Sequence, residues 1–366
     1  MPSNRHTPRS VLVTGGAGFI GSNYLLAAAP SQSAVQFVNL DALTYAGQRE
    51  NLSSLEGRPN YRFQQGDIAD RGLVERLFEA HNFDTVIHFA AESHVDRSIL
   101  DPLAFVRTNV MGTATLLEVA RQRWKDRGDV RFHHVSTDEV FGSLGPEGAF
   151  TEDTPYAPRS PYSASKAGAD HLVRAYHETY GMPVVISNAS NNYGPLQYPE
   201  KLIPLVIQNA VNQDPVPVYG KGANIRDWLH VLDHCDAIDR IVRSAPDGST
   251  YLVCGAEERS NLDIVHLLLD LVDEALERKP RISRELIRFV TDRPGHDFRY
   301  ALDGSRLAAD LDWRPSRSLE QGLRETVEWY LTNPEWLEQT RSRTYDEYYS
   351  TQYGDRIDTG NPTQAI

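Results

Sequence analysis

The chain has 366 residues, of which 40% are hydrophobic and 24% charged, and its formal net charge is −13. The length suits two domains, and no apolar run reaches the roughly 18 residues of a membrane-spanning helix. The acidic balance argues against nucleic acid or an anionic membrane surface as a partner. A polar N-terminus without a secretory signal, and two cysteines (Cys235 and Cys254) in no metal or redox spacing, predict a cytoplasmic protein without a metal site.

The first half of the chain alternates short β-branched runs with longer helical patterns, which predicts a parallel sheet with crossover helices. The expected strands are 11–15, 35–41, 61–67, 85–91, 130–137 and 183–190. The expected helices are 19–29, 70–80, 101–126 and 162–180. The predicted fold class is therefore α/β, with a doubly wound Rossmann sheet and a smaller mixed α/β domain that binds substrate.

The domain division follows from where this alternation stops. We expect residues 1–194 to form the cofactor-binding domain, joined by a return segment near 223–245 that has the pattern of a strand leading into a helix. Several prolines interrupt the alternation after residue 194, so 195–341 are expected to form mainly the substrate domain. Residues 342–366 are polar and rich in tyrosine, which predicts a tail with little packing of its own.

A glycine-rich turn follows the first expected strand. Gly16, Gly18 and Gly21 satisfy G-x-G-x-x-G, which permits a tight turn and lets a pyrophosphate approach the backbone and the N-terminus of the next helix. Asp41 ends the second strand twenty residues past Gly21, where it would meet ribose hydroxyls and repel a 2′-phosphate, so NAD is favoured over NADP. Asp67 ends the third strand and either faces the adenine or caps the following helix.

Two further pairs of residues indicate chemistry. Tyr162 and Lys166 form Y-x-x-x-K on one face of an expected helix, where a lysine can stabilise the phenolate, lower its pKa and hold the nicotinamide ribose. Asp138 and Glu139 stand side by side in VSTDEVFG, at the end of a buried strand. Neighbouring carboxyl groups push their pKa values apart, which suits a reaction that needs one acid and one base.

With these motifs the chain resembles the extended short-chain dehydrogenases/reductases, and specifically the nucleotide-sugar 4,6-dehydratases that act on dTDP-glucose. The similarity extends from Val11 to about Leu337. The matching stretches are VTGGAGFIGS, DALTYAG, AAESHVDRSI, RFHHVSTDEVFG, SPYSASKA, NASNNYGP, PEKLIPLVI, YGKG, IRDWL and DRPGHDFRYALD.

The resemblance implies a hydro-lyase that uses NAD to convert dTDP-glucose to dTDP-4-keto-6-deoxyglucose and water. Tyr162, assisted by Lys166, would take the proton of the 4-hydroxyl while hydride leaves carbon 4, and Thr137 would hydrogen-bond the same oxygen. Glu139 would then remove the proton on carbon 5 and Asp138 would protonate the leaving 6-hydroxyl, before hydride returns to carbon 6.

The resemblance also implies the binding residues. The implied cofactor contacts are Gly15, Gly18, Phe19, Ile20, Gly21, Asp41, Leu43, Thr44, Asp67, Ile68, Phe89, Ala90, Ala91, Thr108, Ser136, Tyr162, Lys166 and Asn192. The implied substrate contacts are Ser93, Thr137, Asn191, Lys201, Leu202, Pro217, Val218, Tyr219, Arg226, Asn261, Arg293 and His296. Three of these are cations, as a diphosphate needs on an acidic protein: Lys201, Arg226 and Arg293.

Several alternatives stay open. An NAD-dependent nucleotide-sugar 4-epimerase would share the glycine turn and the Y-x-x-x-K pair but not the acid pair, and an NAD-binding protein without chemistry would need neither pair. Leu196 and Gln197 stand where the family usually has an aromatic residue and histidine, so a preference for UDP-glucose remains possible. Other departures are Phe141, Ala189 and His230. The resemblance also implies a homodimer that pairs helices 101–126 and 162–180.

Overall fold

The structure, a computed structural model, describes residues 5–292 and 295–340, and a seven-stranded sheet lies at its centre. All neighbouring strands are parallel, in the order β10-β6-β5-β4-β1-β2-β3. The strands are β1 (Ser10–Thr14), β2 (Gln36–Asp41), β3 (Tyr61–Gln65), β4 (Thr85–His88), β5 (Arg131–Thr137), β6 (Val184–Ala189) and β10 (Thr250–Val253). The predicted α/β class is confirmed, and the order reverses between β1 and β4, where such sheets form a ligand-binding crevice.

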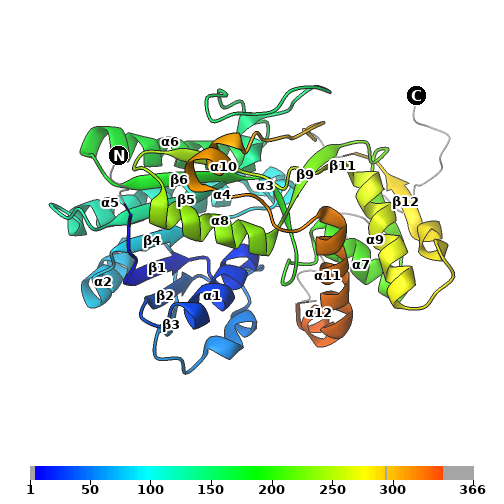
Figure 1. Ribbon diagram of the computed structural model, residues 1–366, viewed down its shortest axis with the longest axis horizontal. Helices are drawn as coiled ribbons and strands as arrows, with labels where there is room; N and C mark the ends of the chain where they lie inside the picture. The colour runs from blue at the N-terminus through cyan, green and yellow to red at the C-terminus, as the bar shows by residue number, and fades with distance from the viewer. Residues whose placement is uncertain (1–4, 293–294, 341–366) are drawn as a thin grey trace.

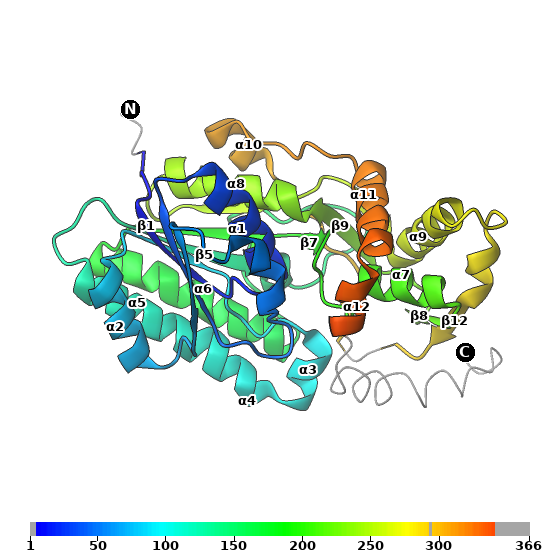
Figure 2. The ribbon, with the colours of Figure 1, turned by 90° about the horizontal axis from the view of Figure 1, so that it is seen from below.

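Helices cover both faces of this sheet (Figures 1 and 2). On one face lie α1 (Phe19–Ser31) and α8 (Val231–Ser244), which pack against each other. On the other face lie α2 (Arg71–His81), α5 (Thr113–Arg123) and α6 (Pro161–Tyr180). The sheet is therefore buried on both sides, which explains why its strands are apolar throughout rather than alternating.

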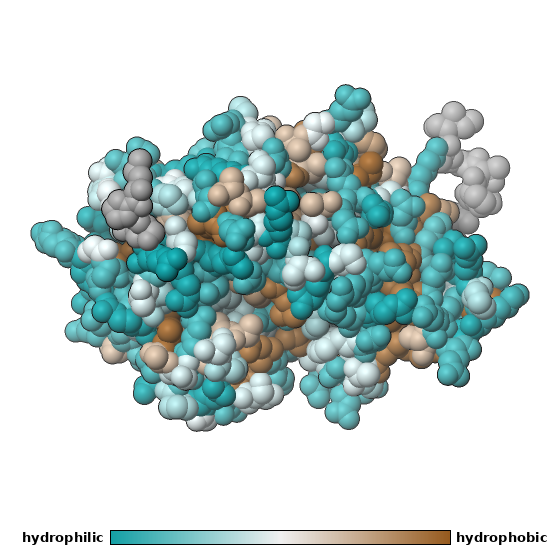
Figure 3. All heavy atoms as spheres, viewed as in Figure 1, coloured by the Kyte–Doolittle hydropathy of each residue, from teal (hydrophilic) through white to brown (hydrophobic). Residues whose placement is uncertain are grey.

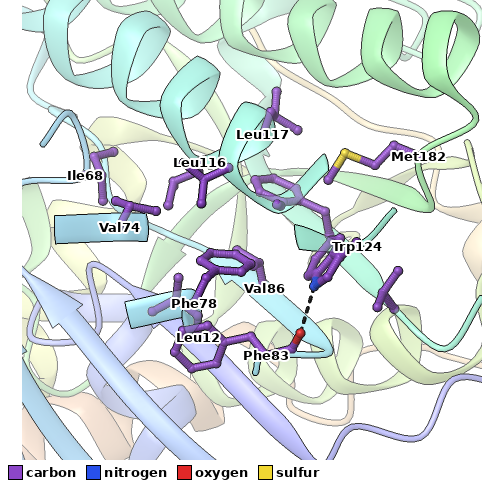
Figure 4. Close-up of a cluster of buried hydrophobic side chains, with 14 of the residues drawn as sticks. Leu12, Ile68, Val74, Phe78, Phe83, Val86, Leu116, Leu117, Trp124 and Met182 are labelled. Carbon is purple, nitrogen blue, oxygen red and sulfur yellow. Dashed lines mark hydrogen bonds between the residues drawn. The ribbon is translucent and has the colours of Figure 1, made fainter. Parts of the chain in front are cut away.

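The core between the sheet and the second helix layer is shown in Figure 4. Leu12 of β1 and Val86 of β4 meet Phe78 of α2 and Trp124, which directly follows α5. The Trp124 indole donates a hydrogen bond to the carbonyl of Phe83 at 2.7 Å, so the one polar group of this side chain is satisfied in the core.

The helix expected over 101–126 is divided in the structure. It consists of α4 (Pro102–Phe105), a π-helical segment η2 (Val106–Gly112) and α5, and it is preceded by a short α3 (Val95–Leu100) that the sequence pattern did not predict. Asp101 begins α4 by accepting a hydrogen bond from the Ala104 N–H. π-Helical turns are rare and often occur at functional sites, and Thr108 in η2 lines the cleft described below.

The second part of the molecule lies beside the carboxyl ends of the strands (Figure 2). It has a three-stranded sheet, β11-β9-β7, and a two-stranded sheet, β12-β8. Its strands are β7 (Asn191–Tyr193), β8 (Val216–Tyr219), β9 (Ile225–His230), β11 (Glu258–Ser260) and β12 (Ile287–Val290). Its helices are α7 (Leu202–Asn212), α9 (Asn261–Ala275), η4 (Ile282–Leu286), α11 (Leu319–Thr332) and α12 (Pro334–Thr340).

The C-terminal half contributes further elements to the central-sheet part, in addition to the return segment that was predicted near 223–245. Strand β10 pairs with β6, and α10 (Ser305–Leu311) packs on β10, although both follow that segment in the chain. The division at residue 194 stays a prediction, and the tail 342–366 lies outside the described residues. Among the helices that the structure describes, none is long and apolar enough to cross a membrane.

Candidate active site

A cleft runs along the carboxyl ends of the central strands, between the sheet and the second part of the molecule. Figure 3 shows apolar residues gathered between these two parts, while hydrophilic residues cover most of the rest of that face. All residues predicted to contact the cofactor line this cleft except Leu43 and Asn192. Further residues line the cleft that were predicted neither as cofactor contacts nor as substrate contacts: Leu40, Ala42, Ala46, Gly47, Gly66, Glu92, Val135, Gln197, Tyr198 and Glu200.

The two exceptions have partners within the protein. The Leu43 N–H donates to Oδ1 of Asp41 at 2.8 Å, so Leu43 supports the carboxylate rather than lining the cleft. Asn192 donates to the carbonyl of Ser190 at 2.9 Å, and its Oδ1 lies 2.9 Å from Nδ1 of His234. The predicted cofactor contacts of Leu43 and Asn192 therefore have no support from the lining of the cleft.

The glycine-rich turn between β1 and α1 closes one end of the cleft. Gly15 has φ +70°, and a Cβ there would lie 2.6 Å from the backbone of Ala90. A Cβ on Gly21 would lie 2.4 Å from the carbonyl oxygen of Gly15, so only glycine fits either position. In the described chain no side chain caps α1 and its first turn has no acidic residue, which leaves its N–H groups facing the cleft. This end of the cleft fits a pyrophosphate.

Asp41 and Asp67 line the cleft beyond this turn. Asp41 accepts the N–H of Ala17 as well as that of Leu43, and burial raises its pKa although these hydrogen bonds oppose the rise. Asp67 accepts the N–H of Ala69 at 2.8 Å and forms an ion pair with Arg107 at 3.2 Å. The alternative in which Asp67 caps α2 is wrong, because Asp70 caps that helix.

Tyr162 and Lys166 lie one turn apart on α6 and face the other end of the cleft. The helix begins with a capping box between Ser160 and Ser163, which fixes its first turn directly before Tyr162. The Lys166 ammonium donates to the carbonyl oxygen of Val135 at 2.9 Å. Burial lowers the pKa of Lys166 to about 8, opposed by the charge of Asp170.

The predicted lowering of the Tyr162 pKa is not found. Burial raises the pKa of Tyr162, the charge of Glu139 adds to the rise, and hydrogen bonding to Thr137 opposes it. The ammonium of Lys166 is directed at Val135 instead. Within the chain itself, Tyr162 is therefore held as a neutral phenol.

The acid pair lies where β5 turns into a 3₁₀-helix, η3 (Asp138–Phe141). Thr137 accepts the N–H of Glu139 at 3.2 Å and its hydroxyl lies 3.2 Å from Oδ1 of Asp138. Asp138 is buried, and its Oδ2 has no hydrogen-bond partner among the described residues. Burial raises the pKa of Asp138 well above its usual range, Glu139 raises it further, and Arg226 opposes both. Asp138 is thus held as a neutral carboxylic acid beside a second carboxyl group.

The residues predicted to contact substrate lie mostly in the second part of the molecule, but Ser93 follows β4 and Thr137 ends β5 of the central sheet. Ser93 and Lys201 line the cleft, and the Lys201 ammonium donates to the Ser93 carbonyl at 3.1 Å. Arg226 in β9 is buried, and its guanidinium lies 4.2 Å from the ring centre of Tyr300 and donates to the Asp297 carbonyl at 2.9 Å. Arg226 therefore lies close enough to Asp138 to act on its pKa.

The remaining predicted substrate residues do not line the cleft as it stands. They are Thr137 at the end of β5, Asn191 at the start of β7, Leu202 at the start of α7, Pro217, Val218 and Tyr219 in β8, Asn261 at the start of α9, and His296. The rings of Tyr219 and His296 are 6.2 Å apart, so these two meet. Arg293 lies outside the described residues.

Fold and cleft together define a class of protein. A doubly wound sheet with a glycine-rich turn at its switch point, and a buried Tyr-x-x-x-Lys pair facing the same crevice, is the arrangement of an extended short-chain dehydrogenase/reductase. The family model described as GDP-mannose 4,6-dehydratase matches residues 12–326.

Known proteins place the chain more narrowly. A dTDP-glucose 4,6-dehydratase of Xanthomonas campestris pv. campestris is 54% identical over 342 residues, which are 91% of this chain and 96% of that protein. A dTDP-glucose 4,6-dehydratase of Bacillus anthracis, solved in complex with NAD, is 42% identical with a TM-score of 0.82 and covers 91% of this chain and 99% of its own. A UDP-glucose 4-epimerase of Thermus thermophilus, also solved with NAD, is 29% identical with a TM-score of 0.78, over 88% of this chain and 99% of its own. The chain belongs to the nucleotide-sugar 4,6-dehydratase family.

Proposed function

We propose that the chain is an NAD-dependent hydro-lyase that converts dTDP-glucose to dTDP-4-keto-6-deoxyglucose and water. The observation that carries this proposal is the buried Asp138 beside Glu139, both close enough to Tyr162 to act on its pKa. Burial raises the pKa of Asp138, which favours the acid form. An oxidation or an epimerisation needs no second acid and base, whereas the loss of water needs a group that accepts a proton and a group that donates one.

NAD fits the cleft through residues already described. The open N-terminus of α1 and the turn at Gly15 would hold the pyrophosphate, Asp41 would face the adenosine ribose, and Ser136 and Lys166 would lie beside the nicotinamide. When bound, NAD supplies the hydride acceptor for carbon 4 of the sugar and the hydride donor for carbon 6. The positive charge of an oxidised nicotinamide would also offset the effect of Glu139 on Tyr162.

The side chains divide the proton transfers between them. Tyr162 would take the proton of the 4-hydroxyl as a phenolate, the form that the positive charge of an oxidised nicotinamide would favour. Thr137 would hold the same oxygen, because the two side chains meet at the end of β5. Glu139 would remove the proton on carbon 5, which a 4-keto group makes acidic. The raised pKa of Asp138 favours its protonated form, so Asp138 would donate its proton to the leaving 6-hydroxyl.

The test is to incubate the purified chain with dTDP-glucose and to follow product mass and the absorbance of bound nicotinamide. A product lighter by one water supports the dehydratase, an isomer of unchanged mass supports the 4-epimerase, and binding without conversion supports a non-catalytic protein. UDP-glucose assayed in parallel measures the nucleotide preference, for which Gln197 in the lining of the cleft is the departure to examine.

We also propose a homodimer in the cytoplasm. An exposed apolar patch lies on α3, α4 and η2 and is formed by Ile99, Leu100, Leu103, Val106 and Met111. Leu100 and Leu103 are 71% and 76% exposed, which is unusual for leucines that are neighbours in space. The patch borders α6, the second helix that the resemblance assigns to the interface. Cys235 and Cys254 are buried free thiols, as expected in a reducing compartment.

A further inference from the structure

A buried carboxylate that the proposed mechanism does not use lies one helical turn after Lys166. Asp170 is fully buried in α6. Its Oδ2 accepts hydrogen bonds from the Ser136 hydroxyl at 2.9 Å, the Tyr156 hydroxyl at 2.8 Å and the Asn188 amide at 3.2 Å. A charge buried at this depth is retained only where such donors compensate it.

The second oxygen of Asp170 faces an imidazole that also faces the lysine. His134 Nε2 lies 3.1 Å from Oδ1 of Asp170 and 3.3 Å from the Lys166 ammonium. Burial lowers the pKa of His134 to about 4, so the ring is neutral and Nε2 either carries a proton or accepts one. Nε2 can therefore form a hydrogen bond with only one of these two neighbours at a time, as a donor to Asp170 or as an acceptor from Lys166.

The negative charge of Asp170 acts on both His134 and Lys166. Burial opposes ionisation of Asp170, but His134, Lys166 and the hydroxyl of Ser136 outweigh burial and lower its pKa. An ionised carboxylate only accepts hydrogen bonds, whereas an ammonium only donates them. In the structure Nε2 of His134 is bonded to the Lys166 ammonium, while Oδ1 of Asp170 has no hydrogen-bond partner among the described residues. The Val135 carbonyl and His134 therefore hold the ammonium, and the charge of Asp170 lies behind the imidazole.

We propose that Asp170 is a positioning residue: it orients Ser136 directly, and its buried negative charge stabilises the ammonium of Lys166 at the nicotinamide end of the cleft. The proposal rests on the proposed function, since it assigns the lysine a task in the hydride step. It also explains why Ser136 and Lys166, which come from a strand and a helix, face the same end of the cleft.

The surroundings of Lys166 leave Asp170 as its electrostatic support. From β5 the lysine meets His134 and the Val135 carbonyl, and from β4 it meets His88, whose pKa burial lowers well below its usual range. On α6 its titratable neighbours are Tyr162, which is held neutral, and Asp170. In the described part of the chain, Asp170 is the only group found to raise the pKa of Lys166.

The first experiment compares Asp170→Asn with Tyr156→Phe. The Tyr156 exchange removes a hydrogen bond to the same carboxylate oxygen but leaves its charge, so it is the matched control. The rate at which dTDP-glucose reduces bound NAD in a single turnover is measured against pH. Because burial lowers the pKa of Lys166 to about 8, we expect the native rate to fall as pH rises through about that value. In Asp170→Asn the pH at which the rate falls should be lower by roughly one unit. In Tyr156→Phe that pH should be unchanged.

The proposal is overturned if the rate of the Asp170→Asn protein falls at the same pH as the rate of the native protein, even if the variant is slower at every pH. Asp170 would then have a structural role only. The native protein separates this failure from failure of the proposed function. If dTDP-glucose does not reduce bound NAD in the native protein, the function is wrong; if it does and the fall does not move, only the role of Asp170 is wrong.

A second readout needs no substrate. Thermal unfolding is compared for the native chain, Asp170→Asn, Lys166→Met and the double variant. If the two charges support each other, Asp170→Asn lowers the unfolding temperature less in the Lys166→Met background than in the native one, because no uncompensated ammonium remains. An equal loss in both backgrounds contradicts the coupling. If Asp170→Asn alone does not fold, folding of the double variant supports the proposal, and failure of both contradicts it.

Discussion

Glu139 is the residue on which the proposed loss of water depends most directly. Exchange for glutamine keeps the size of the side chain and removes the base, so oxidation at carbon 4 should persist while elimination is slowed about 10²–10⁴-fold. Reduced nicotinamide should therefore accumulate on the enzyme when Glu139→Gln meets dTDP-glucose, and product mass should show little loss of water. If this variant dehydrates dTDP-glucose at the native rate, Glu139 is not the base of the elimination.

Asp138 gives a prediction in which activity and stability change in opposite directions. The folded protein keeps Asp138 protonated, whereas the unfolded chain ionises it above its ordinary carboxyl pKa, so the native residue costs stability as pH rises. Asp138→Asn removes this cost. The variant should unfold at a higher temperature than the native protein near pH 8, with the difference shrinking toward about pH 4.

The same exchange should slow dehydration, because an amide cannot donate the proton that the leaving hydroxyl needs. Asp138→Ala is the control, since it also removes the carboxyl group but leaves a space in a buried position. If Asp138→Asn and the native protein keep the same difference in unfolding temperature at both pH values, Asp138 is not the neutral acid described above.

At this scale the sequence predicts the residues that stand in contiguous motifs. Tyr162, Lys166 and the acid pair were all found facing one region, because a strand end and a helix start meet there. Asp170 and His134 were not predicted. The sequence does not show whether a polar residue is exposed to solvent or buried beside a lysine. Only the packing of α6 on β5 reveals that Asp170 and His134 are buried next to Lys166.

Among the elements, the turn between β1 and α1 allows the sharpest test. Gly21→Ala would place a Cβ 2.4 Å from the carbonyl oxygen of Gly15, so the turn must move away from its present position. We expect the purified variant to retain much less NAD and to lose about 1–3 kcal/mol of stability. Gly128→Ala is the control, because a Cβ at Gly128 meets nothing within 4 Å. Full retention of NAD by Gly21→Ala would contradict the placement of the pyrophosphate at this turn.

The six strands expected in the first half of the sequence were all found, with ends that differ by a few residues. Their apolar runs are long enough to be recognised because the sheet is buried on both faces. The short strands β7 and β11 have three residues each, which is too few for a period to be visible. The π-helical segment η2 was also missed, since it shares the apolar spacing of the helices around it.

Across the whole molecule, the cleft is bordered by contacts between its two parts. Glu200, which precedes α7, forms an ion pair of 3.0 Å with Arg97 of α3, and the Arg97 guanidinium lies 3.8 Å from the ring centre of Tyr45. Lys201 reaches the carbonyl of Ser93 from the same segment. Adjacent residues of one segment thus tie the second part of the molecule to the central-sheet part at the border of the cleft.

The exposed apolar patch on α3, α4 and η2 gives the last prediction. If the patch is the dimer interface, a charge at its centre must lose its hydration on association, so Leu103→Asp should convert the dimer to a monomer at micromolar concentration. Light scattering measures the mass. Phe289→Asp is the control, because Phe289 is also an exposed apolar residue, at 53%, but lies on β12 in the second part of the molecule. If the dimer persists in Leu103→Asp but not in Phe289→Asp, the interface lies near β12 in the second part of the molecule. A native protein that is already monomeric would contradict the proposed homodimer.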